Sequence, residues 1–309
     1  MTELSGKIIG QYLVRKTGGQ KKAFREMLTA ELGKAGIEAR EEKYRDMAGS
    51  VNVIVGDVEK AKLIFGAHYD TCPRMPYPNF ITPLNKPLYY TYQMGIVLIL
   101  VIVSLAAEVL AAKLVSEEFG RLVWFIVYFG VLALMMKGPA NPNTYNDNTS
   151  GVVTLTELML KMPEELRSQC AFVYFDNEEM GLMGSGAFRK AHKEQAKNTA
   201  MINLDCVGDG GYLLLVASKA FREDAKLYAA VKSIFEEQDG ALHADAEKAV
   251  YPSDQKKFNK SLALNALNKG PRVGYYMNRI HTVHDTVLKE ENVSRISGGL
   301  CALAEEYLK

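Results

Sequence analysis

Short apolar runs recur along most of the chain, each about the length of a buried β-strand. They are rich in Val, Ile, Leu and Phe, and several end in an acidic residue or a histidine. Apolar runs bounded by polar turns are typical of strands that are buried on both faces of a sheet. The predicted strands lie within residues 50–56, 61–71, 170–179, 199–210, 211–219 and 273–278.

Segments with apolar positions at helical spacing alternate with these runs. The clearest is residues 19–36, which ends at a glycine, as helices often do. The alternation of strands and helices predicts an α/β fold: a three-layer, mostly parallel twisted sheet with helices on both faces. The predicted helices are residues 19–36, 149–162, 184–193, 221–238 and 291–308.

Two further apolar runs, residues 95–107 and 122–136, are longer and free of charge. Extended into their flanks, to Met94–Val115 and Phe119–Lys137, they would form helices about 33 Å and about 28 Å long. A hydrocarbon core is about 30 Å thick. We therefore expect residues 91–137 to form an inserted hydrophobic helical hairpin, and residues 1–90 with 138–309 to form a single domain.

The placement of this hairpin has three alternatives. It spans a bilayer twice, lies in the membrane interface or re-enters it, or forms a soluble lid or dimerisation arm. Glu108 interrupts the first run and argues against a simple span. Membrane association is favoured because few soluble lids are hydrophobic without a pattern on both helices. The N-terminal residues do not resemble a signal peptide, so the expected side is cytoplasmic.

Charge and cysteine content narrow the function classes. Lys and Arg total 37 against 36 Asp and Glu, which leaves a net charge of +1. With no dense basic patch, this balance gives no support for nucleic-acid binding. The four cysteines (Cys72, Cys170, Cys206 and Cys301) are widely spaced and show no CxxC pair. They fit buried reduced thiols better than a disulfide framework.

Polar residues gather just beyond the ends of three predicted strands. His68 follows the first, Glu178 and Glu179 the second, and Asp205 the third. In open α/β sheets the functional crevice lies beyond the carboxyl ends of the strands, so we expect these side chains to meet on one rim. Asp70, two residues after His68, is placed to accept the other ring N–H of that histidine.

Imidazole and carboxylate groups are the ligands that zinc and other divalent metals use in hydrolytic sites. Asp147, in the turn "NDNTSG", adds a further carboxylate. Each residue alone has a simpler explanation: His68 as a polar residue ending a strand, Asp147 as a helix N-cap, the two glutamates as a solvated acidic turn. Their combination is what indicates a metal site.

The order of these motifs resembles peptidase family M28, the co-catalytic zinc peptidases. The motifs are His-x-Asp, Asp-Asn-x-Ser-Gly, Glu-Glu-x-Gly-x-x-Gly-Ser, Asn-Leu-Asp, Ser-Asp and His-Thr-x-x-Asp-Thr. The resemblance implies a zinc-exopeptidase-like catalytic domain and an aminopeptidase that acts on peptides with a free N-terminus. It also implies two zinc ions per chain. The apolar hairpin, which lies outside the resemblance, adds the expected membrane association.

The resemblance also implies a role for each residue. His68 and Asp205 would bind one zinc, Glu179 and His281 the other, and Asp147 would bridge them. Glu178 would be the general base that activates a zinc-bound water. Asp70 and Asp285 would support the ligands, and His284, at a variable position of the last motif, would either support a ligand or lie at the surface.

Three departures and two rival functions qualify this hypothesis. Asn177 stands where the family often has glycine, Gln255 where it often has histidine, and Cys206 directly follows a ligand. These changes bear on substrate preference rather than on competence. The rivals are a glutaminyl cyclase that works with a single zinc and a membrane module without catalysis. A homo-oligomer is compatible with each of these functions.

Overall fold

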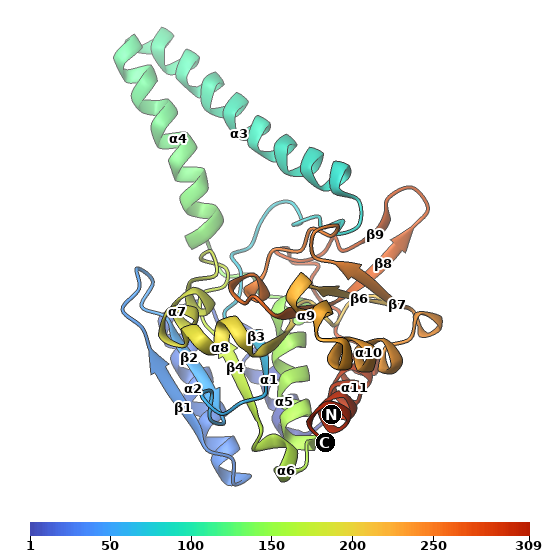
Figure 1. Cartoon of the computed structure of the whole chain (residues 1–309). Coiled ribbons are helices and arrows are strands. Elements are labelled where there is room, and N and C mark those ends of the chain that lie inside the picture. The colour runs from blue at the N-terminus through green and yellow to red at the C-terminus, as the bar shows by residue number, and fades with distance from the viewer.

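The computed structural model describes residues 1–309 and has the predicted α/β fold (Figure 1). One sheet runs through the molecule in the order β1-β2-β4-β3-β5-β8-β6-β7, with β9 paired to β8. The strands are β1 (Ala39–Lys43), β2 (Val51–Val55), β3 (Leu63–His68), β4 (Cys170–Phe175), β5 (Ala200–Leu204), β6 (Tyr212–Ala217), β7 (Ala241–Asp245), β8 (Ser261–Gly270) and β9 (Gly274–Tyr276).

The sheet is parallel at its centre and mixed outside it. Strands β4, β3, β5 and β8 pair in parallel, as do β6 and β7 at one edge, whereas β1 with β2, β2 with β4, β8 with β6 and β8 with β9 pair antiparallel. The parallel pairing predicted from the apolar runs is therefore continuous only across the central strands, which helices cover on both faces. Their carboxyl ends meet at one edge, and this edge carries the candidate site.

Helices cover one face of the sheet more completely than the other. The larger hydrophobic cluster joins Phe24, Leu155 and Leu300 of three helices to inward residues of the strands, such as Phe65 and Ile202. Two smaller clusters lie on the opposite face. The helices are α1 (Glu3–Gln11), α2 (Gly18–Lys34), α5 (Gly151–Lys161), α6 (Glu164–Arg167), α7 (Met183–Ala191), α8 (Lys193–Asn198), α9 (Lys219–Glu223), α10 (Ala225–Ile234) and α11 (Glu290–Leu308).

The sheet region differs from the sequence prediction in the helix expected over residues 221–238 and in three strands that were not predicted, β1, β7 and β8. The single helix expected over residues 221–238 is interrupted, because the Asp224 carboxylate caps α10 by accepting the Leu227 N–H at 3.0 Å. Strand β8, which the sequence analysis did not assign, lies between β5 and β6 and is buried along most of its length. It completes the sheet beside β5, the strand that Asp205 follows directly.

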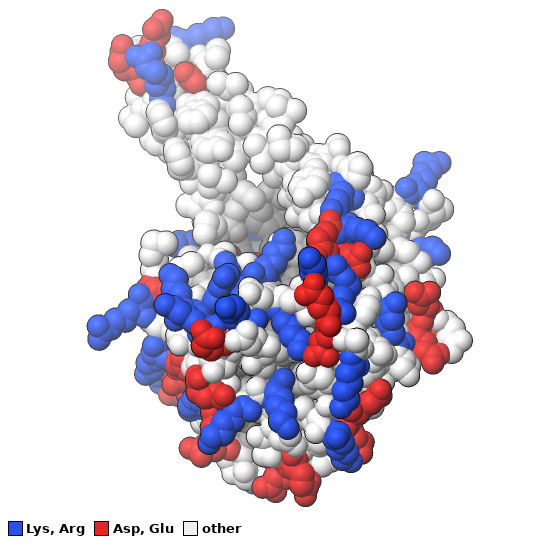
Figure 2. Space-filling view, viewed as in Figure 1, with Lys and Arg blue, Asp and Glu red and all other residues white.

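The predicted hydrophobic hairpin is present as α3 (Lys86–Leu114) and α4 (Glu117–Lys137), which project together from the body of the molecule (Figure 1). Both are long and apolar enough to cross a membrane by length and composition. Figure 2 shows an uncharged shaft with charged residues gathered at its tip. Large apolar side chains are exposed along the shaft, among them Ile99 at 63% and Ile126 at 60%.

Candidate metal centre

The predicted ligands come together at the carboxyl ends of the central strands. His68 is the last residue of β3, and Asp205 follows β5 directly. Glu178 and Glu179 lie in the loop after β4, Asp147 in a one-turn segment (Tyr145–Ser150) before α5, and His281 in the loop before α11. This is the crevice where open α/β sheets place their functional residues.

These side chains form two groups that share Asp147. In the first, His68 Nε2 lies 3.4 Å from Asp147 Oδ1 and 3.5 Å from Asp205 Oδ1. In the second, His281 Nε2 lies 3.1 Å from Asp147 Oδ2 and 3.5 Å from Glu179 Oε2. The two oxygens of one carboxylate therefore face two different histidines, which is the arrangement that a bridging ligand needs.

The turn that carries Asp147 is held by the side chains of its neighbours. Asn148 donates to the carbonyl of Leu204 at 3.0 Å and accepts the Cys206 N–H at 3.1 Å, which ties the turn to the end of β5. A side chain at Gly151 would bring Cβ within 2.3 Å of the Leu204 carbonyl oxygen. The Asn-Asp-Asn-Thr-Ser-Gly sequence thus fixes Asp147 against the strand that supplies Asp205.

Two further aspartates hold the backbone around the ligands. Asp285 accepts the N–H groups of Asn146 at 2.8 Å and of Asp147 at 3.0 Å. Asp70 accepts the N–H groups of Glu178 at 2.9 Å and of Glu179 at 3.2 Å. The His68 ring nitrogen Nδ1 lies 3.1 Å from the carbonyl oxygen of Asp70 and 3.5 Å from its carboxylate. Asp70 therefore orients both the histidine and the paired glutamates.

The buried carboxylates give the site a strong preference for positive charge. Burial raises the pKa of Glu178 well above its ordinary range, and Glu179 and Asp205 raise it further against the effect of His68. Burial also raises the pKa of Glu179 to about 8. For His281 burial lowers the pKa, but the neighbouring carboxylates outweigh it and raise the value to about 9.

Two buried carboxylate oxygens of the cluster, Glu179 Oε1 and Asp205 Oδ1, accept no hydrogen bond. An unsatisfied buried acceptor costs about 1–3 kcal/mol, so such atoms usually have a partner. Bound cations would supply it, and imidazole with carboxylate is a donor set that zinc uses. The residues present therefore fit zinc.

A cavity of about 380 Å³ opens onto this cluster. One wall comes from residues that the sequence analysis did not connect with the site: Asn79, Ile81, and Tyr89 and Gln93 in the first turns of α3. Tyr251 also lines the cavity, and its hydroxyl donates to the Asp205 carbonyl at 3.1 Å. The apolar hairpin and the candidate site are thus directly connected.

The three residues that depart from the family pattern lie in different surroundings. Gln255 does not line the cavity; its side chain accepts from Asn203 at 3.1 Å and donates to the Tyr251 carbonyl at 2.7 Å. Cys206 lines the cavity but packs in an apolar cluster. Asn177 has φ of +54°, a conformation that suits glycine and asparagine better than other residues, which accounts for asparagine at this position.

Backbone strain is concentrated around the cluster. Every non-glycine residue with left-handed φ adjoins the ligands or lines the cavity, and each such residue costs about 1–3 kcal/mol. His281 is itself in the cluster, whereas His284 is exposed. The residues are Asn177, Leu182, Cys206 and His281.

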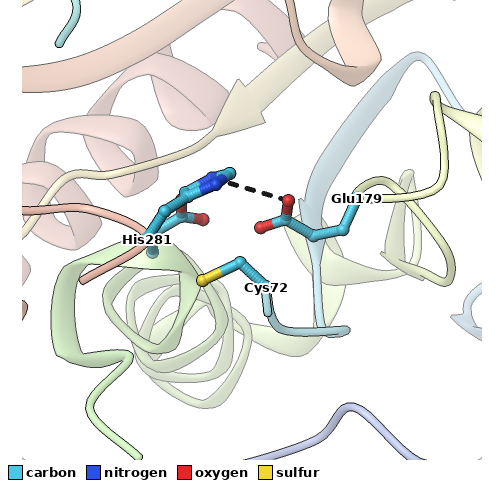
Figure 3. Close-up of side chains that lie close together, drawn as sticks. Cys72, Glu179 and His281 are labelled. Carbon is cyan, nitrogen blue, oxygen red and sulfur yellow. Dashed lines mark ion pairs between the residues drawn. The ribbon is translucent and has the colours of Figure 1, made fainter. Parts of the chain in front are cut away.

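One neighbour of the cluster was not expected from the sequence. Cys72 lies beside Glu179 and His281 (Figure 3), and its sulfur is within 4.8 Å of the ligand atoms of Asp147, Glu179 and His281. Its side chain is fully buried. Burial and the nearby carboxylates raise the pKa of the Cys72 thiol well above its ordinary value, so without a cation beside it the group is neutral.

Comparison with known proteins gives one family match and several structural matches. Residues 135–298, just over half of the chain, match the model of peptidase family M28. No curated protein sequence matches the chain.

Three solved structures illustrate the structural similarity. A glutaminyl cyclase from Porphyromonas gingivalis is 14% identical with a TM-score of 0.59, covering 98% of this chain and 96% of that one. A Zn-dependent exopeptidase from Parabacteroides distasonis is 15% identical with a TM-score of 0.58, covering 99% and 97%. The LapA aminopeptidase of Legionella pneumophila is 15% identical with a TM-score of 0.55, covering 98% and 69%. At these identities the similarity establishes the fold alone.

Proposed function

The chain belongs to peptidase family M28, as its motifs led us to expect, and from that premise we propose that it is a membrane-associated aminopeptidase that uses two zinc ions. The observation that carries the proposal is the position of Asp147. Its two carboxylate oxygens face His68 at 3.4 Å and His281 at 3.1 Å, so one residue serves two ligand groups.

Each ligand group has residues suited to one ion. His68 and Asp205 would hold one, Glu179 and His281 the other, and Asp147 both. When bound, two zinc ions polarise the scissile carbonyl, stabilise the developing oxyanion and make a water molecule more acidic. Asp70 and Asp285 contribute by fixing the backbone of Glu179 and Asp147, so the ligand positions are set before binding.

Glu178 is the residue best placed to move protons. It lines the cavity next to the ligand Glu179, and its own N–H is held by Asp70 at 2.9 Å. As general base it takes a proton from the attacking water and then gives that proton to the leaving amine. General acid–base catalysis by a positioned side chain contributes about 10²–10⁴-fold to rate.

The cavity supports action at a peptide end. A volume of about 380 Å³ is in the range of sites that enclose a small molecule rather than a folded segment. A free α-amino group is positively charged, and a cavity lined by buried carboxylates favours such a group. These features match peptide substrates with a free N-terminus.

The hairpin supports placement at a membrane. Its exposed shaft is apolar, and Glu108, the residue that argued against a span, lies within two turns of the polar tip. In a two-span arrangement Glu108 is therefore away from the bilayer centre, where an ionised side chain costs most. The wall formed by Tyr89 and Gln93 would then hold the cavity close to the bilayer surface. The cytoplasmic side stays a prediction from the sequence.

A glutaminyl cyclase is the second candidate, because structures of such enzymes are among the similar ones. A cyclase working with one zinc has no need of a second ligand group such as His68 with Asp205, which lie 3.5 Å apart beside the bridging carboxylate. His68 and Asp205 therefore favour the peptidase.

The test is turnover of matched peptides by detergent-extracted protein. Peptides with a free N-terminus, their N-acetylated counterparts and a peptide beginning with glutamine are incubated with zinc, with chelator, and with the Glu178→Gln variant. We expect loss of the first residue from free peptides only, abolished by chelator and reduced by about 10²-fold or more in Glu178→Gln. Cyclisation of the glutaminyl peptide without cleavage of the others would contradict the peptidase.

A further inference from the structure

Cys72 differs from the other buried cysteines in its surroundings. Cys170 and Cys206 each pack in a hydrophobic cluster. Cys72 belongs to none of the three clusters, although its side chain is fully buried. Its sulfur instead lies within 4.8 Å of the ligand atoms of Asp147, Glu179 and His281. Apolar packing therefore does not account for its position.

The loop that carries Cys72 is fixed relative to His281. The Cys72 carbonyl accepts the Asn141 N–H at 3.2 Å, and the Asn141 side-chain amide lies 3.8 Å from the sulfur and donates to the Thr282 carbonyl at 2.8 Å. Three residues further on, the Met75 N–H donates to the His281 carbonyl at 2.7 Å. Cys72 and His281 therefore keep their relative positions.

A second observation points to a ligand at this place. Glu179 Oε1 is buried and has no hydrogen-bond partner, while the Glu179 side chain is only 10% exposed. Figure 3 shows the carboxylate of Glu179, the ring of His281 and the thiol of Cys72 gathered around one space. A carboxylate without a partner beside a thiol and an imidazole is an arrangement that a cation would satisfy.

We propose that Cys72 is a thiolate ligand of the metal held by Glu179 and His281, an inference that rests on the metal binding of the proposed function. When the metal–sulfur bond forms, the thiol proton is released to solvent, and no oxidation or reduction is involved. A cation favours the thiolate form because a coordinating thiol is deprotonated.

Ligation by Cys72 makes the two metal positions unequal. The position with Asp147, Glu179, His281 and Cys72 has four protein donors, which is typical of closed zinc sites. The position with His68, Asp205 and shared Asp147 has three, which leaves room for water or substrate. The sulfur also makes the closed position select zinc, cobalt or cadmium over manganese or magnesium, because thiolates prefer softer metals.

Cobalt(II) substitution tests the proposal through a spectrum rather than through activity. Thiolate ligation gives a sulfur-to-cobalt charge-transfer band in the near ultraviolet, which oxygen and nitrogen ligands do not give. We expect the band in the wild-type protein, its loss in Cys72→Ser, and its persistence in Cys206→Ser, a buried cysteine beside Asp205 but outside the four-residue group. Cys72→Ser should also bind one of its two zinc ions more weakly, by at least the roughly 10- to 100-fold that losing a supporting partner of a metal ligand costs.

A measurement on the wild-type protein alone covers the case in which Cys72→Ser fails to fold. Zinc X-ray absorption should show scattering from sulfur at about 2.3 Å beside the shell of nitrogen and oxygen at about 2.0–2.2 Å. Metal-loaded protein without sulfur scattering and without the cobalt band would overturn the proposal. Sulfur ligation in a protein that cleaves no peptide would instead contradict the proposed function and leave Cys72 as a ligand.

Discussion

At the scale of single residues, Asn177 can be used to test whether the left-handed backbone beside the ligands is strained. Replacing it by glycine or by alanine removes the same hydrogen bonds, to Ser50 and from Lys21. Only alanine retains a Cβ in the left-handed conformation at φ of +54°. We expect Asn177→Ala to be about 1–2 kcal/mol less stable than Asn177→Gly in chemical denaturation. Equal stabilities would show that the conformation at this position carries no strain.

Replacing Asp70 should weaken the orientation of the metal ligands without unfolding the protein. Asp70→Ala removes the acceptor of two N–H groups at the paired glutamates, so we expect roughly 10- to 100-fold lower zinc affinity or activity. The matched control is Asp46→Ala, which also removes an acceptor of two backbone N–H groups, those of Ala48 and Ser50. Isothermal titration with zinc measures both variants; equal zinc affinities in the two would contradict the role of Asp70.

At the scale of elements, the apolar pattern predicted a strand or helix correctly where a single periodicity ran through the whole element. β3, β4 and β5 and the long helices α2, α5 and α11 lie close to their expected positions. Strands β1, β7 and β8 were not predicted. In β8 the reason is that "SLALNALNKG" mixes buried asparagine and serine with apolar residues. The interruption of the helix at Asp224 was not predicted. In a helical sequence pattern a capping aspartate cannot be distinguished from an acidic surface residue, and only its hydrogen bond identifies it.

The first turns of α3 give a prediction about substrate selection. Tyr89 and Gln93 line the cavity, whereas the neighbouring Tyr90 is 55% exposed and does not. We expect Tyr89→Ala and Gln93→Ala to raise KM or change the preferred first residue, with kcat/KM falling roughly tenfold or more and the metal content unchanged. Tyr90→Ala is the control. The measurement is the steady-state kinetics of the three variants on one peptide panel. Identical kinetics in all three would show that α3 does not contribute to substrate selection.

At the scale of the whole molecule, the exposed hairpin predicts membrane partitioning. Ile99→Lys with Ile126→Lys places two charges near the middle of α3 and α4, at a cost of about 2.5–3.5 kcal/mol each in a bilayer. Because both positions are exposed, the soluble fold should not suffer. The control is Met47→Lys, because the Met47 side chain is 98% exposed but lies outside the hairpin. Fractionation of cell membranes should show the double variant shifting to the soluble fraction and the control staying with the membrane. A double variant that remains in the membrane fraction would contradict the anchor.

The candidate site was predictable from the sequence only in part. The motifs, whose order is specific, identify six residues as candidates that the structure brings together: His68, Asp147, Glu178, Glu179, Asp205 and His281. Cys72, Tyr89 and Gln93 were not predicted, because their nearness to the site depends on how the loop after β3 and the base of α3 fold back over the sheet edge. No periodicity or spacing in the chain encodes that contact.

The central claim, that Asp147 joins two metal groups, is tested most directly by counting metal. Purified wild-type protein and the His68→Ala and His281→Ala variants are analysed for zinc by mass spectrometry, with folding checked by circular dichroism. We predict two zinc ions per wild-type chain and one in each variant, because each histidine belongs to a different group. A single zinc in the wild-type protein that survives the loss of His68 would contradict the claim.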